Sequence, residues 1–161
     1  MSLQIKENFL SEKEYIDIYS LLTSDYFPWY FNGYKSSPVE KKLFNYQFTH
    51  SFYNNDKVNS DYFNALQPIL TKLNYLSLIR IKANLNPISN KLIEYEPHKD
   101  KLYKCKVAIY YVNTNNGYTM IKNEKVKSKK NRMVLFDSTL EHYGTNSTDC
   151  NNRMVINFNY F

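Results

Sequence analysis

The sequence is poor in cysteine and glycine and lacks a long apolar run. Its two cysteines, Cys105 and Cys150, come without a secretory context, so we expect free thiols rather than a disulfide framework. No stretch is apolar over the length of a transmembrane helix. The N-terminal residues contain no apolar signal core, which predicts a cytoplasmic protein. These absences favour a soluble globular protein.

Length and composition agree with this class. With 161 residues the chain can form one domain with a real hydrophobic core, and we expect a single domain over residues 1–161. The hydrophobic fraction of 43% and the charged fraction of 22% are those of a globular protein. Sixteen tyrosines and ten phenylalanines favour β-strands over helices, because aromatic side chains pack well on a pleated surface.

The net charge of +6 raises the question of an anionic partner such as nucleic acid. Most of the lysines are scattered, and the only dense cluster is residues 122–130, between two predicted strands. We interpret this cluster as a solvated hairpin. A basic nucleic-acid-binding module stays open as an alternative; it would require a coherent surface patch and steeply salt-dependent binding.

Two helices are predicted in the first half of the chain. Ser11 and Glu14 form a capping-box pattern ahead of apolar residues at helical spacing, which predicts a helix over 12–22. A second helix is predicted over 60–73. Pro68 lacks an amide proton and should kink or split it.

The rest of the chain reads as short alternating strands. They are predicted over residues 44–52, 76–85, 104–113, 118–121, 133–136 and 153–160. Short strands without regular intervening helices fit a jelly roll of two packed sheets, with the two N-terminal helices covering one sheet. In the last strand, successive side chains point to opposite faces. Arg153 shares one face with residues 155, 157 and 159, and this mostly polar row should line a water-filled cavity. Met154, Ile156 and Phe158 share the other face and should pack beneath the helices.

One set of residues can bind a metal ion. His98 and Asp100 form an H-x-D element, and on an extended backbone their side chains point to the same side. With His142 they make two nitrogens and one oxygen, the facial triad that holds non-haem Fe(II). His50 lies on an aromatic face, and we expect it to be hydrogen-bonded in the core or cleft. Arg153 opens the final strand, where it could bind a carboxylate in bidentate fashion.

This order of residues resembles a known family. An H-x-D element, a distal histidine and an arginine at the head of the closing strand are the pattern of the Fe(II)/2-oxoglutarate-dependent oxygenases, and the closer likeness is to the prolyl-4-hydroxylase-like branch. The likeness spans residues 78–161. Within it, three strands resemble strands of that branch: 108–113, 132–137 and 153–160.

The resemblance implies a fold and an activity. The fold would be mainly β with flanking helices (α+β), a cupin-like double-stranded β-helix with a barrel over about 76–161 and a buttress over about 1–75. The cofactors would be Fe(II), 2-oxoglutarate as co-substrate and O2, with ascorbate as a candidate reductant. The enzyme would hydroxylate a C–H bond of a peptide, an amino acid or another small substrate and release succinate and CO2.

The resemblance also implies residue roles. Arg153 would pair with the 5-carboxylate of 2-oxoglutarate, Tyr111 would direct its hydroxyl at the same carboxylate, and Asn157 would line the site. The iron ligands, which are also the catalytic residues, would be His98, Asp100 and His142.

The chain departs from the branch at three places. Asn152 and Asn131 stand where glycine is common, and residues 117–119 replace a more glycine-rich acidic segment. These departures concern loop geometry and substrate specificity more than metal binding. A second alternative therefore stays open beside the nucleic-acid-binding module: a cupin-like protein that uses the same barrel and a metal for isomerisation or ligand binding without 2-oxoglutarate.

Overall fold

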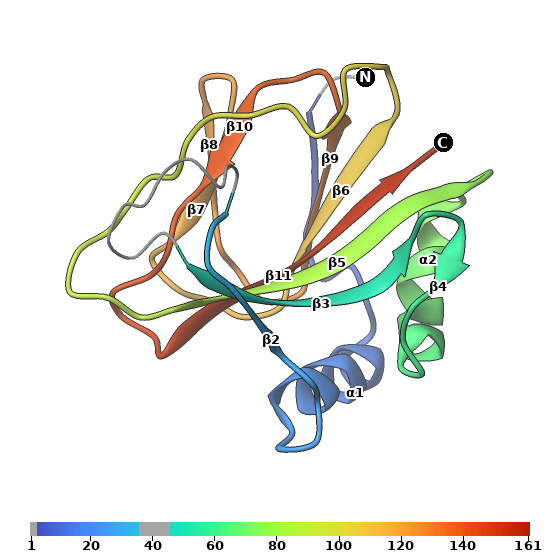
Figure 1. Ribbon diagram of the computed structural model, residues 1–161, viewed down its shortest axis with the longest axis horizontal. Coiled ribbons are helices and arrows are strands. Elements are labelled where there is room, and N and C mark those ends of the chain that lie inside the picture. Colours follow the sequence, from blue (N-terminus) through green and yellow to red (C-terminus); the bar gives the residue numbers. More distant parts are fainter. Residues whose placement is uncertain (1–2, 36–45) are drawn as a thin grey trace.

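The computed structural model describes residues 3–35 and 46–161, which form two β-sheets with helices on one side (Figure 1). The helices are α1 (Glu12–Thr23), the 3-10 helix η1 (Phe63–Leu66) and α2 (Gln67–Leu73). In the described part of the chain, none of the helices combines the length and apolarity that a bilayer crossing requires.

The large sheet is antiparallel, and its strands follow the order β1-β9-β6-β11-β5-β3-β2, with β4 paired to β3. Its central strands come from distant parts of the sequence, so the end of the chain lies at the middle of the sheet. The strand bounds are β1 Gln4–Lys6, β2 Tyr30–Asn32, β3 Gln47–Asn54, β4 Lys57–Val58, β5 Leu78–Pro87, β6 Lys106–Tyr111, β9 Arg132–Asp137 and β11 Asn152–Tyr160. The start of the strand predicted over 44–52 lies outside the described residues.

The small sheet faces the large one and has the order β10-β7-β8. Its strands are β7 (Tyr118–Ile121), β8 (Glu124–Lys127) and β10 (His142–Gly144). The β7–β8 hairpin contains much of the lysine cluster, as predicted. Two isolated bridges, Glu94 to Thr145 and His98 to His142, add the segment before β6 to the edge of this sheet.

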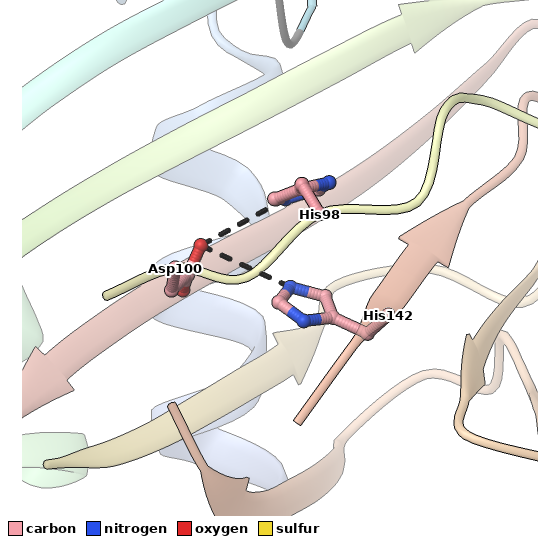
Figure 2. A group of neighbouring side chains, drawn as sticks. All are labelled: His98, Asp100 and His142. Atoms are coloured by element: carbon pink, nitrogen blue, oxygen red, sulfur yellow. Dashed lines mark ion pairs between the residues drawn. The ribbon is translucent and has the colours of Figure 1, made fainter. Parts of the chain in front are cut away.

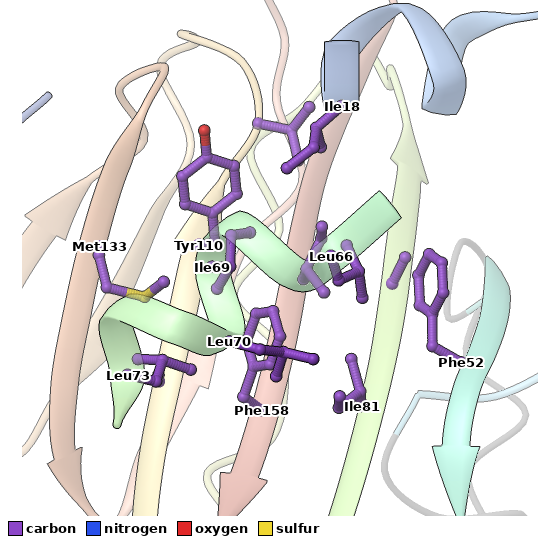
Figure 3. Packing of buried hydrophobic residues seen from close by; sticks show 14 of the residues in the cluster. Ile18, Phe52, Leu66, Ile69, Leu70, Leu73, Ile81, Tyr110, Met133 and Phe158 are labelled. Atoms are coloured by element: carbon purple, nitrogen blue, oxygen red, sulfur yellow. The ribbon is translucent and has the colours of Figure 1, made fainter. Parts of the chain in front are cut away.

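The helices pack on the outer face of the large sheet. Ile69, Leu70 and Leu73 of α2 lie against strand residues such as Ile81 and Phe158 (Figure 3). The first helix has the predicted capping box. The second is divided next to Pro68, as predicted: a 3-10 turn precedes an α-helix that begins at residue 67, because proline fits the first turn of a helix but not its interior. The helical stretch begins at residue 63 and not at residue 60.

A second apolar cluster occupies part of the space between the two sheets and includes Val107, Val134 and Val155. The alternation of β11 divides its side chains as predicted. Met154, Ile156 and Phe158 belong to the cluster beneath the helices, while the row of Arg153 faces the small sheet. Two facing sheets, one covered by helices, form the expected jelly roll.

Candidate metal centre and cofactor pocket

His98 and His142 meet across the edge of the small sheet. Each backbone N–H donates to the carbonyl of the other residue, and both hydrogen bonds are 2.9 Å long. The two imidazole centroids are 4.5 Å apart. Because residues paired across an antiparallel bridge present their side chains to the same face, this pairing brings two sequence-distant imidazoles to one point.

Asp100 completes the group (Figure 2). Its side chain is 8% exposed, and its Oδ2 accepts a hydrogen bond of 2.7 Å from Nδ2 of Asn159 on β11. Nη2 of Arg80 on β5 lies 3.4 Å from Oδ1. The large sheet therefore fixes the carboxylate, and the small sheet presents the two imidazoles to it.

The histidine nitrogens are oriented for metal binding. Nδ1 of His98 lies 3.2 Å from the carbonyl of Glu96, and Nδ1 of His142 lies 3.1 Å from that of Leu140. When Nδ1 carries the proton and donates to these carbonyls, Nε2 keeps its lone pair. Both Nε2 atoms lie 3.8 Å from Oδ1 of Asp100.

These separations fit a shared ion. One donor atom from each of the three residues lies within 4.8 Å of the other two. Atoms bound at about 2 Å from one ion lie about 3–4 Å apart, so a small rotation of the side chains would close the site. Two imidazole nitrogens and one carboxylate oxygen, with further positions left open, suit Fe(II).

The pKa shifts favour the metal-binding protonation states. Burial would raise the pKa of Asp100, but Arg80, His142 and Asn159 together outweigh it and hold that pKa below its usual value. Burial lowers the pKa of His142, and the nearby Asp100 only partly opposes this. At neutral pH the carboxylate is therefore ionised and the His142 imidazole is neutral, as a metal requires.

The triad opens into a cavity of about 300 Å³ between the sheets. This is near the lower end of the range for small-molecule sites. Arg153 and Asn157 line the cavity together with the three triad residues. One cavity is thus lined by five of the six residues for which the sequence predicted a role in binding iron or 2-oxoglutarate; the exception is Tyr111.

Arg153 is a buried cation, with an exposed fraction of 3%. Its Nε donates to Oγ of Ser128 at 2.8 Å, and its Nη2 donates to Oγ1 of Thr119 at 3.0 Å. No carboxylate within residues 3–35 and 46–161 forms an ion pair with it. Burial lowers the pKa of Arg153, opposed by Tyr111 and Tyr95. Since a buried unpaired charge is costly, this guanidinium is suited to an anionic ligand.

Tyr111 lies behind Arg153 and does not line the cavity. Its ring centroid is 5.6 Å from Cζ of Arg153, and its hydroxyl donates to Oγ1 of Thr119 at 2.7 Å. The hydroxyl of Thr119 therefore joins the tyrosine to the guanidinium. In this arrangement Tyr111 orients the groups that face the cavity.

Gly117 allows Arg153 to reach its position. A Cβ atom at residue 117 would collide first with the backbone carbonyl of Asn146 and would lie 2.6 Å from Cδ of Arg153, closer than such atoms approach. This glycine lies in the segment that departs from the oxygenase pattern in sequence. Glycine is required here by the close approach of both the Asn146 carbonyl and the arginine side chain.

Several cavity residues were not singled out in the sequence. Nζ of Lys35 lies 3.2 Å from the ring centroid of Tyr95, and burial together with the charge of Arg153 lowers the pKa of this lysine to about 6. Neither residue has a periodic pattern that would have identified it. Arg80 and Lys82 do have such a pattern, because they lie on the polar face of the alternating strand predicted over 76–85.

His50 is hydrogen-bonded in the core, as expected, and does not line the cavity. Its Nδ1 is 2.8 Å from the carbonyl of Pro28, and its Nε2 is 2.7 Å from Oγ of Ser60. Both ring nitrogens therefore have partners. His50 is a hydrogen-bonded histidine among aromatic rings.

Comparison with known proteins gives matches of structure only. No family model matches the sequence, and no curated protein matches it significantly. The fold is similar to a prolyl hydroxylase from Trichoplax adhaerens, solved with a hypoxia inducible factor oxygen degradation domain peptide fragment. That match has a TM-score of 0.72 and 16% identity and covers 99% of this chain and 83% of the other.

Two further solved structures are similar. A 2OG-Fe(II) oxygenase family oxidoreductase from Burkholderia pseudomallei matches with a TM-score of 0.68 and 8% identity, over 98% of this chain and 84% of the other. A prolyl-4-hydroxylase from Pseudomonas putida matches with a TM-score of 0.62 and 12% identity, over 98% and 91%. At such identities the likeness concerns architecture: the chain has the jelly-roll fold of the 2-oxoglutarate- and Fe(II)-dependent oxygenases, prolyl hydroxylases among them.

Proposed function

We propose that the chain is an Fe(II)- and 2-oxoglutarate-dependent dioxygenase. In this proposal the iron is held by His98, Asp100 and His142. The observation that supports 2-oxoglutarate as the co-substrate is the environment of Arg153. Its guanidinium is buried in the same cavity and has no carboxylate partner within the described residues. Bound iron would supply the activation of O2, coupled to the oxidation of 2-oxoglutarate to succinate and CO2.

The residues around Arg153 support a carboxylate in front of it. Thr119 and Ser128 accept hydrogen bonds from its Nη2 and Nε, which leaves Nη1 for a ligand. The 5-carboxylate of 2-oxoglutarate would pair with the guanidinium in a charge-assisted hydrogen bond. Tyr111 would hold Thr119 in place, and Asn157 would contact the ligand from the cavity wall.

The remaining residues would exclude water and orient the metal ligands. Ile109 and Val155 supply the apolar part of the cavity wall. The backbone carbonyls of Glu96 and Leu140 hold the Nδ1 protons of the two histidines. Asn159 holds Asp100 through Oδ2, so Oδ1 stays directed at the imidazoles.

A metal-binding protein that does not use 2-oxoglutarate is less well supported. It would explain the triad, but it would leave the buried charge of Arg153 without a partner. We further propose a small-molecule or peptide substrate. The prolyl hydroxylase from Trichoplax adhaerens was solved with a peptide, and this likeness supports the peptide class only by analogy.

The test is turnover of 2-oxoglutarate without added substrate. Protein is supplied with Fe(II), 2-oxoglutarate and ascorbate under anaerobic conditions, air is then admitted, and succinate is measured. We expect slow succinate formation that requires Fe(II) and that His142→Ala abolishes. Metal binding without any binding of 2-oxoglutarate would instead support the cupin-like alternative.

A further inference from the structure

The cavity face of two neighbouring strands is almost entirely polar. On β5 this face presents Arg80, Lys82, Asn84 and Asn86, and on β11 the residues paired with them are, in the same order, Asn159, Asn157, Val155 and Arg153. Only Val155 is apolar. A site built for an apolar group such as a prolyl ring would bury apolar side chains here, so this wall points to a polar substrate.

Buried polar atoms without partners gather on the same two strands. Within residues 3–35 and 46–161 the buried side-chain nitrogen and oxygen atoms that lack a hydrogen bond are Arg80 Nε, Asn84 Oδ1, Asn86 Oδ1, Asn157 Oδ1 and Asn159 Oδ1. Asn84 and Asn86 are only 5% and 4% exposed. Since buried polar groups are nearly always paired, this row is suited to a ligand with hydrogen-bonding groups of its own.

The cavity also carries more positive charge than 2-oxoglutarate requires. Among the described residues that line it, four cations face two carboxylates: Arg80, Lys82, Lys99 and Arg153 against Glu96 and Asp100. Lys35 is not counted, because a pKa of about 6 leaves it mostly neutral at pH 7. Bound Fe(II) would add two positive charges, and 2-oxoglutarate would bring two negative ones. The excess of cations therefore remains when both are present.

Arg80 and Lys82 are two of these cations, and both interact electrostatically with Asp100 of the triad. Arg80 reaches Oδ1 of Asp100, the same atom that lies 3.8 Å from both histidine Nε2 atoms. A metal bound to this oxygen would repel the guanidinium and free it for another anion. Lys82 has no ion-pair partner in the described part of the chain, and burial and Arg80 lower its pKa to about 8.

These cations are separate from the position proposed for the co-substrate. Lys82 lies four residues from Asn86, the β5 residue paired with Arg153, which is about 13 Å along a strand. Ser128 and Thr119 bind the Arg153 guanidinium, and the carboxylate of Asp100 lies near Arg80. The cavity therefore offers two separate positions for an anion, one beside Arg153 and the other beside Arg80 and Lys82, close to the proposed metal site.

We infer that the substrate of this site is a small polar molecule that carries an oxyanion, a carboxylate or a phosphate, bound by Lys82 and Arg80 beside the metal. The amide side chains of Asn84 and Asn157 would pair with its N–H or O–H groups. This inference rests on the proposed function and adds the class of substrate to it. A neutral prolyl peptide is the competing substrate.

The experiment compares matched acids and neutral analogues by isothermal titration calorimetry. The protein is loaded with Mn(II), which replaces Fe(II) to prevent turnover, and with saturating 2-oxoglutarate. The probes are N-acetyl-L-alanine and N-acetyl-L-proline against their amides, glycerol 3-phosphate against glycerol, and a neutral proline-containing peptide. We expect an acid or the phosphate to bind more tightly than its neutral analogue.

Variants then locate the binding. Lys82→Met should weaken the preferred anion about tenfold, the effect of losing one charge-assisted hydrogen bond, and Lys82→Arg should retain the preference. Lys57→Met, on the exposed strand β4, is the matched control and should bind as wild type. A comparison of the affinities of the N-acetyl amino acids with that of glycerol 3-phosphate shows whether the site prefers a carboxylate or a phosphate.

The opposing results are distinct. Equal or tighter binding of the neutral analogues or of the peptide, or no binding of any anion to the loaded protein, would overturn the inference. So would a loss of 2-oxoglutarate affinity in Lys82→Met as large as the loss for the anions, because Lys82 would then belong to the co-substrate. Failure of wild-type protein to bind Mn(II) or 2-oxoglutarate would count against the proposed function instead.

Discussion

His98 and His142 exchange a pair of backbone hydrogen bonds, so the position of one imidazole is tied to that of the other. Side-chain rotation adjusts the imidazoles, but their separation is set by the sheet. Asp100 is placed from the opposite sheet through Asn159. The three proposed ligands are therefore held close together by the fold itself, and we expect the folded protein to bind a metal ion with measurable affinity.

We predict that His98→Ala and His142→Ala each reduce Mn(II) affinity by about 100-fold or more, since loss of a ligand should exceed the effect of losing a group that only orients one. His50→Asn is the control, because His50 bonds to Pro28 and Ser60 outside the cavity. Titration of the three variants by calorimetry measures the effect. If the His50 variant lost metal as completely as the others, the assignment of ligands would be wrong.

The protonation of His142 predicts a pH dependence. Its pKa in the folded protein lies below the ordinary value of 6.5, so as the pH falls below 6.5 the unfolded chain takes up a proton before the folded one does. The stability contributed by neutral His142 is thus present above pH 6.5 and is lost as the pH falls through its folded pKa. We expect Mn(II) affinity to be level above pH 7 and to fall on acidification.

Chemical denaturation of metal-free protein at several pH values measures this loss of stability. His142→Asn, which cannot titrate in this range, should lose less of its free energy of unfolding between pH 7 and pH 5 than the wild type does. Parallel pH profiles for the two proteins would contradict the assigned protonation state. Asp100 should not contribute in this window, because its pKa lies below its ordinary value of 3.8.

Arg153→Gln should weaken 2-oxoglutarate by about 2–5 kcal/mol while leaving Mn(II) affinity nearly unchanged, since the guanidinium is buried and no triad residue contacts it. Arg132→Gln is a matched control: that arginine pairs with Glu7 and does not line the cavity. Calorimetric titration of 2-oxoglutarate into each Mn(II)-loaded variant measures the difference in affinity between Arg153→Gln and Arg132→Gln. An unchanged affinity in Arg153→Gln would remove this residue from the co-substrate site.

A methyl group at Gly117 should have a similar but smaller effect. Gly117→Ala would place Cβ against the backbone carbonyl of Asn146 and 2.6 Å from Cδ of Arg153, so the loop and the arginine side chain must both shift. Overpacking of this kind costs about 1–3 kcal/mol of folding stability, and the shift of the guanidinium should weaken 2-oxoglutarate binding. In the control, Gly33→Ala, the new Cβ would meet only a ring atom of Phe31 at 3.6 Å, which is ordinary contact. We expect 2-oxoglutarate affinity to fall in the first variant only; equal affinities in both would show that the arginine can adjust.

The sequence by itself determined the first helix, the longer strands and the direction of their side chains, whereas short strands such as β1, β4 and β10 were not predicted. Alternation placed Arg153 and Asn157 on the cavity face of the last strand and Met154 beneath the helices, because a strand turns successive side chains to opposite faces. The spacing of His98 and Asp100 likewise predicted that both would reach one point. These are local properties, and the backbone conformation alone decides them.

Only the tertiary structure decided which distant residues meet. The hydroxyls of Thr119 and Ser128 reach Arg153, and Asn159 holds Asp100. Lys35 enters the cavity from the segment after β2. No spacing in the sequence predicts any of these contacts. Register between strands and the packing of one sheet on the other create these contacts. Both depend on the whole chain, because each strand finds its partners far away in the sequence.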